Sequence, residues 1–256
     1  MTVNACAALV QAGDPDRFLA AMAAPAALRG GLFTLYALNL EVAKAPFVTQ
    51  EPMIAEMRLQ FWRDTVADAV AGKPVRAHEV AAPLAELLAA RSLPEDMLDA
   101  MIAARRFDIY PGDPGQSGLD LDSYLRRTGG HLMALTGLAL GMDVPRVAAA
   151  QDVGQAMGTA LWLRAIPDLA GHARVAADDL DSAALQARAQ AGLDLLAKHR
   201  GTRFGAATPA IRAGWLTRPI LQQAVQDPRQ VIDGALGVSE FQRRGGLLWR
   251  SVAGRW

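Results

Sequence analysis

Three arginines, Arg29, Arg164 and Arg174, are suited to binding a phosphate-bearing ligand. The planar guanidinium group presents its N–H donors as a fork that matches the oxygens of a phosphate. Each guanidinium could instead bind a carboxylate, such as Asp108 or Asp168, or the carbonyl at the end of a helix. The residues leave both interpretations open for Arg29 and Arg174, whereas a structural role is favoured for Arg164.

Carboxylates are the second kind of side chain that could do chemistry, because several together can hold a divalent cation. Two carboxylates four residues apart on a helix face the same way and could share a metal. Glu41 is a single carboxylate with Lys44 three residues later, and pairing with that lysine is the favoured interpretation. The four histidines and the one cysteine are not spaced as zinc ligands. We therefore expect no metal site, no cofactor and no catalytic residue.

The elements that position these side chains are predicted to be helices. The chain is rich in Ala, Leu, Met and Arg, and no run alternates apolar and polar residues as a strand would. Pro15 and Pro52 are placed to open helices, and Gly72 and Gly141 are placed to close them. The predicted helices cover residues 3–11, 15–24, 26–44, 52–71, 78–90, 94–109, 119–141, 145–166, 181–199, 208–224 and 239–252.

Composition restricts the classes of function. Of 256 residues, 52% are apolar and 20% are charged, which is typical of a globular protein, and no linker divides residues 1–256, so we expect one domain. The formal net charge is zero, which argues against a nucleic-acid partner. A lone Cys6 fits a reducing compartment. No basic residue precedes Arg17, and the longest uncharged apolar stretch is too short to span a bilayer, so we expect a cytoplasmic protein.

Several motifs occur in the order found in the squalene/phytoene synthase family, and the sequence resembles that family. The motifs are Pro25 with Arg29, Leu35-Tyr36-Ala37, Met57-Arg58-Leu59-Gln60-Phe61-Trp62-Arg63, Arg105-Arg106-Phe107-Asp108-Ile109-Tyr110, and Tyr124-x-x-x-Thr128-Gly129-Gly130. The resemblance is clearest over residues 14–178, and residues 179–256 form a divergent helical part. It implies an all-α fold, an isoprenoid (terpenoid) synthase-like helical bundle around a central cavity.

The resemblance also implies a set of side chains around that cavity. The candidates are Arg29, Tyr36, Asn39, Glu41, Asp108, Tyr124, Arg164, Asp168 and Arg174. For Asp108 and Tyr124 a structural hydrogen bond between helices is favoured over chemistry. Gly129 and Gly130 are expected to permit close helix packing or a kink, since they lie in an apolar helical run.

The family condenses two prenyl diphosphates head to head, and its aspartates hold magnesium and diphosphate. The matching positions here are Ala43, Lys44 and Phe47 in the first motif and Ala165 and Leu169 in the second. Glu41 lies before the first set. Asp168 lies beside Leu169, but one residue is about 100° of rotation around a helix, and Pro167 is expected to disturb that turn. The resemblance therefore implies a family member whose metal site has been lost.

Asn39-x-Glu41-x-Ala43 and Leu163-Arg164-Ala165-x-Pro167 resemble one branch of the superfamily. That branch contains the mitochondrial complex I assembly factor with a phytoene-synthase-like domain and its bacterial relatives. The resemblance implies a non-catalytic helper in the assembly of respiratory complex I, with subunits or assembly intermediates of that complex as partners.

Two alternatives remain open. The chain could be an active, magnesium-dependent prenyltransferase of the squalene/phytoene type that uses Glu41, Asp168 and the arginines in unusual roles. It could also be a lipid-binding module that keeps the cavity and carries a polyisoprenoid or a quinone.

The segment 239–256 combines tryptophans and other apolar residues with four arginines, after a capping-box pattern formed by Ser239 and Gln242. A basic amphipathic helix of this kind can lie on an anionic membrane surface, which would place the protein peripherally at the inner membrane. The favoured interpretation is a final helix packed on the bundle with its arginines turned outward. Gly245 and Gly246 are expected to weaken a continuous helix.

Overall fold

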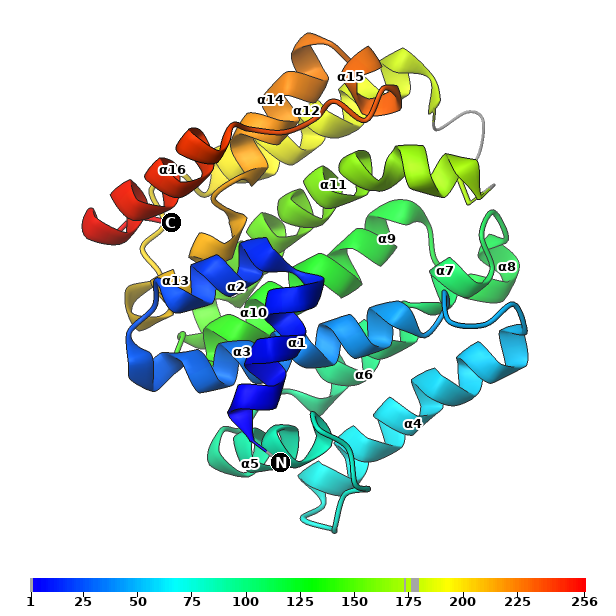
Figure 1. Ribbon diagram of the computed structural model, residues 1–256, viewed down its shortest axis with the longest axis vertical. Coiled ribbons are helices and arrows are strands. Elements are labelled where there is room, and N and C mark those ends of the chain that lie inside the picture. The colour runs from blue at the N-terminus through cyan, green and yellow to red at the C-terminus, as the bar shows by residue number, and fades with distance from the viewer. Residues whose placement is uncertain (1, 173, 176–179) are drawn as a thin grey trace.

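The computed structural model describes residues 2–172, 174–175 and 180–256, and all regular elements in this part of the chain are helical (Figure 1). The α-helices are α1 (Val3–Gly13), α2 (Pro15–Met22), α3 (Ala26–Lys44), α4 (Pro52–Val70), α5 (Ala81–Ala90), α6 (Glu95–Ala103), α7 (Arg106–Ile109), α8 (Pro114–Ser117), α9 (Leu121–Leu125), α10 (His131–Ala139), α11 (Val147–Gly171), α12 (Ser182–Lys198), α13 (Thr208–Ile211), α14 (Thr217–Gln226), α15 (Arg229–Ile232) and α16 (Glu240–Val252). Shorter turns are the π-helix η1 (Arg126–Gly130) and the 3₁₀ turns η2 (Val144–Arg146), η4 (Gly205–Ala207) and η5 (Arg212–Gly214).

The predicted start and stop signals act as expected at several helix ends. The carboxylate of Asp14 accepts a hydrogen bond from the backbone N–H of Arg17, and Pro15 is the first residue of α2. Pro52 opens α4. Gly72 and Gly141 follow α4 and α10 with φ of 67° and 89°, a left-handed conformation that glycine adopts without a steric penalty. Local sequence therefore determines where these helices begin and end.

Three predicted helices are divided, and two others continue through residues that were expected to disturb them. The 94–109 segment forms α6 and α7, the 119–141 segment contains the π-helix η1 between α9 and α10, and the 208–224 segment is broken by η5. Pro167, which was expected to disturb its turn by removing a backbone donor, lies inside α11, and the helix continues past it to Gly171. Gly245 and Gly246, which were expected to weaken a continuous helix, both lie within α16, which is not interrupted there.

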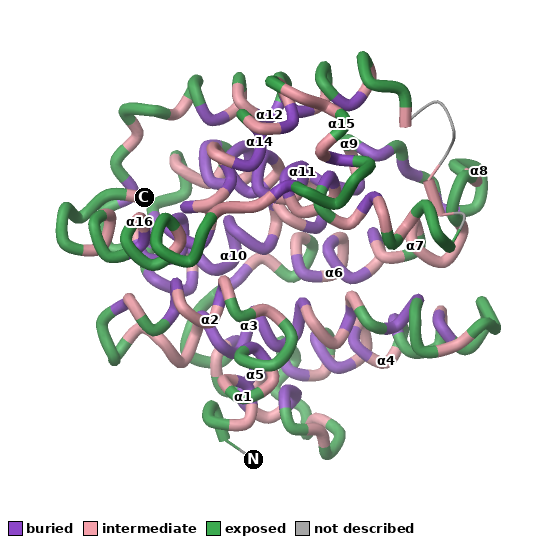
Figure 2. Tube along the Cα trace, turned by 45° about the horizontal axis from the view of Figure 1, so that its top comes forward, coloured by how far each residue is buried: buried purple, intermediate pink, exposed green. Residues whose placement is uncertain are grey.

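The helices are arranged around α11, which packs against α10, α12, α14 and η1 (Figure 1). On the other side of α10, α3 is covered by α1 and α2, and α4 packs on α5 and α6. One continuous cluster of buried apolar side chains extends from Cys6 in α1 to Leu247 in α16. The longest buried runs lie in the middle of the molecule, and the outer turns of α12 and α16 are exposed (Figure 2).

Backbone contact between η1 and α11 brings the two sides of the bundle unusually close. A Cβ on Gly129 would lie 2.5 Å from the carbonyl oxygen of Gly154, and a Cβ on Gly130 would lie 2.9 Å from that of Gln151. No other residue has so small a side chain, so glycine is required for this approach. The expected close packing at Gly129 and Gly130 is thus confirmed, and the widened π-turn is the local form that it takes.

Within the described residues, no helix is both long enough and apolar enough to cross a bilayer.

Candidate ligand cavity between α3 and α11

A cavity of about 230 Å³ lies between the C-terminal half of α3 and the C-terminal half of α11. Its third wall is formed by α9 and η1, and the segment from Arg105 to Asp108 closes one side. The lining residues are Arg17, Asn39, Ala43, Phe47, Arg105, Asp108, Tyr124, Leu125, Thr128, Gly129, Gly158, Leu161, Trp162, Ala165 and Leu169.

Two stripes with a four-residue spacing turn towards this cavity. On α3 and the turn after it the stripe is Asn39, Ala43 and Phe47, and on α11 it contains Ala165 and Leu169. Residues four apart lie above one another on a helix, so each helix presents one face. Five positions of this chain match the aspartates of the family motifs. Four of the five line the cavity, and their side chains are apolar.

A buried polar network, which includes Asn39 of the α3 stripe, also lines the cavity. Nη1 of Arg105 donates to the hydroxyl of Tyr124 at 2.8 Å, and Nη2 donates to Oδ1 of Asn39 at 3.1 Å. The Tyr124 hydroxyl in turn donates to Oδ2 of Asp108 at 3.0 Å, and Arg105 lies 3.4 Å from the same oxygen. The guanidinium therefore ties three separate helical segments together.

Burial changes the protonation equilibria of this network. It raises the pKa of Asp108 above the usual value for an aspartate, although Arg105 and Tyr124 oppose that effect. It also raises the pKa of Tyr124, so the hydroxyl stays protonated and can donate to Asp108. The Nε of Arg105 is buried and makes no hydrogen bond within the described residues, which leaves one donor unused beside the cavity.

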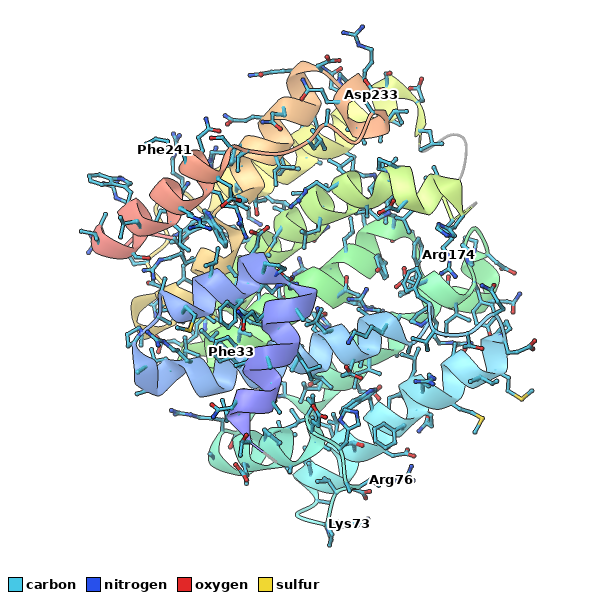
Figure 3. The ribbon with its side chains drawn as sticks, viewed as in Figure 1. Phe33, Lys73, Arg76, Arg174, Asp233 and Phe241 are labelled. Atoms are coloured by element: carbon cyan, nitrogen blue, oxygen red, sulfur yellow. The ribbon has the colours of Figure 1, made fainter. Side chains whose placement is uncertain are left out.

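Arg174 is not among the lining residues and lies beside α7 (Figure 3). It donates to the carbonyl oxygens of Asp108 at 2.8 Å and Pro46 at 3.4 Å. Its guanidinium also lies 4.4 Å from the centre of the Phe47 ring, a cation–π geometry. Arg174 therefore binds helix-end carbonyls in this structure.

Arg17, which lines the cavity, is held by Asp14, whose Oδ2 lies 2.6 Å from Nη1. The same guanidinium lies 5.7 Å from the centre of the Tyr36 ring. Tyr36 is fully buried, and burial raises the pKa of its hydroxyl. Tyr36 thus packs below Arg17 and does not line the cavity.

The remaining candidates lie outside the cavity. Glu41 pairs with Lys44 at 3.2 Å, and Arg29 donates to the carbonyl of Ala24 at 2.9 Å. Arg164, on the surface of α11, forms an ion pair with Asp16 of α2 at 3.7 Å. Asp168, Lys44 and Arg164 are exposed. The structure therefore brings together Asn39, Asp108, Tyr124 and Arg174 and separates them from the other predicted residues.

The cavity walls do not fit the magnesium ions that the family uses. Magnesium takes oxygen ligands, usually carboxylates together with substrate phosphates. Asp108 is the one carboxylate among the lining residues that the structure describes, and it is already bound by Arg105 and Tyr124. Among the residues that the structure describes, no three His, Cys, Asp or Glu side chains are grouped as metal ligands.

Arg105 and Arg17 are the site residues that sequence reasoning missed. A signal existed for each: Arg105 precedes Asp108 by three residues, and Arg17 follows Asp14 by three, the spacing of an ion pair on one helix turn.

A sequence model described as squalene/phytoene synthase matches residues 10–180 of the chain. This chain belongs to the squalene/phytoene synthase family. Its curated relatives include complex I assembly factor 6 homolog of Drosophila melanogaster, which is 32% identical over 174 residues, and complex I assembly factor 6 of Homo sapiens, which is 30% identical over 168 residues. Each alignment covers 65% of this chain, and the chain spans about half the length of these relatives, 51% and 50%.

The fold of this family member matches solved structures over nearly its whole length. A dehydrosqualene synthase in complex with ligand superposes with a TM-score of 0.77 at 15% identity, covering 98% of this chain and 95% of the other. The squalene synthase HpnC from Alicyclobacillus acidocaldarius superposes with a TM-score of 0.58 at 18% identity, covering 98% and 94%. The predicted all-α isoprenoid synthase fold is therefore confirmed.

Proposed function

We propose that this chain is a non-catalytic member of the squalene/phytoene synthase family that assists the assembly of respiratory complex I. The observation that carries the proposal is the replacement of carboxylates by Ala43, Phe47, Ala165 and Leu169 on the two facing helices. Diphosphate is a polyanion, and a divalent cation needs acidic ligands to hold it there. The names of the relatives support the assembly role.

The prenyltransferase alternative is less well supported by the geometry. It requires Glu41 and Asp168 to serve as metal ligands, yet Glu41 pairs with Lys44 and Asp168 is exposed outside the cavity. The lipid-carrier alternative requires space for a long isoprenoid chain. The cavity, at about 230 Å³, lies below the roughly 300–1,000 Å³ of ordinary ligand pockets.

The surface that we assign to the protein partner is an exposed apolar corner that includes Phe47, one of the residues that line the cavity. It consists of Phe47 and Val48 before α4 and of Met53, Ile54 and Met57 within it, each at least 45% exposed. Clustered apolar side chains of this kind mark interaction sites, and methionines adapt to the surface of a partner. We propose in addition that the protein is cytoplasmic and contacts the membrane surface through residues 239–256.

Two experiments test the function. Purified protein incubated with magnesium and farnesyl or geranylgeranyl diphosphate should give no squalene, phytoene or cyclopropyl intermediate on extraction. Deletion of the gene should lower membrane NADH–quinone activity, and the wild-type gene should restore it. Product formation in the first experiment, or unchanged activity in the second, would overturn the corresponding half of the proposal.

The partner surface is tested in the same deletion strain. A gene carrying Met53→Ser and Met57→Ser should fail to restore NADH–quinone activity. A gene carrying Val70→Ser and Val144→Ser, which changes two exposed apolar residues elsewhere, should restore it. Equal restoration by both genes would exclude this corner as the partner surface.

A further inference from the structure

A second cavity lies between the end of α12, η4, α14 and the end of α16. It measures about 960 Å³ and shares no lining residue with the cavity between α3 and α11. Five arginines line it: Arg200, Arg203, Arg218, Arg250 and Arg255. Its described wall includes no aspartate or glutamate. We call it the arginine pocket.

The positive charge of the arginine pocket is not neutralised within the described part of the protein. Other arginines of α16 have carboxylate partners, since Arg243 binds Asp16 at 2.6 Å and Arg244 binds Glu240 at 3.0 Å. None of the five pocket arginines makes such an ion pair in that part of the chain. The pKa of Arg250 is lowered by burial and by the nearby charge of Arg218, as expected when two cations face each other.

The walls of the arginine pocket are fixed by hydrogen bonds to the backbone. The buried Arg212 donates from Nε to the carbonyl of Arg255 at 3.0 Å, and Trp256 donates from Nε1 to the carbonyl of Thr202 at 3.1 Å. The rings of Phe204 and Trp256 pack edge to face at 5.7 Å. The guanidinium groups therefore surround a preformed concave surface.

An exposed apolar face of α16 adjoins this pocket. Phe241, Leu248, Trp249 and Val252 are 87%, 65%, 66% and 77% exposed, and Trp249 also lines the pocket. Positions separated by seven, eight and eleven residues lie on one side of a helix. Figure 3 shows Phe241 pointing away from the bundle. The opposite side of α16 is anchored by the buried Leu247.

We propose that the arginine pocket binds the phosphate group of an anionic phospholipid while the apolar face of α16 enters the membrane interface. Guanidinium forks match phosphate oxygens, and aromatic and apolar side chains are stabilised at the headgroup level. An acidic peptide or a free phosphate would account for the arginines alone and would leave four large apolar side chains in water. The inference rests on the membrane contact proposed above and adds a specific binding site to it.

The test uses the full chain and sedimentation with lipid vesicles. Wild-type protein should sediment with vesicles of phosphatidylcholine mixed with phosphatidylglycerol and stay in solution with vesicles of phosphatidylcholine alone. Arg218→Gln with Arg250→Gln should weaken binding about thirtyfold (about 2 kcal/mol), because each basic residue near an anionic surface contributes about 1 kcal/mol. Arg58→Gln with Arg91→Gln removes the same charge at two exposed arginines elsewhere and should bind as the wild type does.

A second measurement does not depend on the stability of the double variant. Brominated acyl chains should quench the tryptophan fluorescence of the wild type on binding, and Trp249→Phe should remove most of that quenching. If the wild type stays in solution with anionic vesicles, the membrane contact itself is overturned, whether or not it binds inorganic phosphate. If the pocket variant binds anionic vesicles as well as the control variant does, only the assignment of the pocket is overturned. Neither outcome bears on the proposed role in complex I assembly, which the NADH–quinone assay tests.

Discussion

Arg105 and Tyr124 are joined by a 2.8 Å hydrogen bond in which the guanidinium donates to the phenol oxygen. The same phenol donates to Asp108, so a cation, a neutral hydroxyl and a carboxylate form one closed chain beside the apolar stripes. Both Nη atoms of the buried Arg105 thus have partners within the described part of the protein, and only its Nε has none. The network is therefore a structural element of the bundle, and it can be tested as one.

Tyr124→Phe should destabilise the protein by about 1–3 kcal/mol, because Arg105 and Asp108 each lose a buried partner. Urea unfolding followed by circular dichroism measures the change. Tyr110→Phe is the matched control, since the half-buried Tyr110 lies beside Arg106 with no hydrogen bond to its hydroxyl in the described residues, and its effect should stay within about 0.5 kcal/mol. Equal effects of the two substitutions would show that the network contributes nothing specific.

The sequence predicted those parts of the fold that local chemistry determines. The bounds 26–44 were right for α3 because Pro25 precedes it and helix formers fill it. The π-helix η1 was not predictable, because it follows from the contact of Gly129 with Gly154, which are 25 residues apart in the chain and meet only after folding. Long-range packing, and not propensity, decides such interruptions.

In the candidate site, too, local sequence determines some features and long-range packing determines others. Asn39, Ala43 and Phe47 follow a four-residue spacing, and Glu41 lies about 200° away from Asn39 around the helix. That spacing alone places Glu41 on a different face of the helix from the cavity. The position of Glu41 could therefore be predicted from the sequence, although the motif comparison had made it a candidate. The position of Arg174 could not be derived in this way, because the carbonyl oxygens that it binds belong to segments 66 and 128 residues earlier.

Gly154→Ala should destabilise the protein by about 1–3 kcal/mol or prevent folding, because the new methyl group would collide with the backbone at Gly129 and Gly130. Thermal unfolding measures the change. Gly158→Ala, one helical turn further along α11, is the control: its Cβ would lie 3.5 Å from the nearest atom, an ordinary contact. That variant should be as stable as the wild type or more stable by up to about 1 kcal/mol, because alanine favours the helix. Similar losses in both variants would argue against the close approach.

Asp152 should make stability fall at low pH. Burial opposes its ionisation, but hydrogen bonds from Lys198, His199 and Arg126 outweigh that effect and hold its pKa well below the usual range. Below about pH 4 the unfolded chain therefore binds more protons at this site than the folded protein does, so stability decreases as the pH decreases. Asp152→Asn should lose about 1–3 kcal/mol at neutral pH and much of the acid-side slope.

The measurement is urea unfolding across a pH series. Asp108 has a raised pKa and contributes with the opposite sign, but it is present in both proteins, so the difference between the two curves isolates Asp152. Asp68→Asn removes a partly exposed carboxylate that lies 3.8 Å from Lys73 and should leave both the stability and the slope almost unchanged. An acid-side slope that persists in full in Asp152→Asn would assign it to other groups.

Restoring carboxylates at the four apolar positions should create magnesium dependence. In a variant with Ala43→Asp, Phe47→Asp, Ala165→Asp and Leu169→Asp, the new side chains would face one cavity and repel one another, and a bridging divalent cation would relieve that repulsion. A site of this kind stabilises the folded state by about 2.7 kcal/mol when the cation is at about one hundred times its Kd. Magnesium should therefore raise the Tm of this variant and leave that of the wild type unchanged. The matched variant with asparagine at the same four positions keeps the size of each side chain and one of its two oxygen atoms without the charge, and it should show no such rise. A magnesium-dependent Tm in the wild type would mean that other ligands hold the ion, and the proposal of a non-catalytic protein would lose its main support.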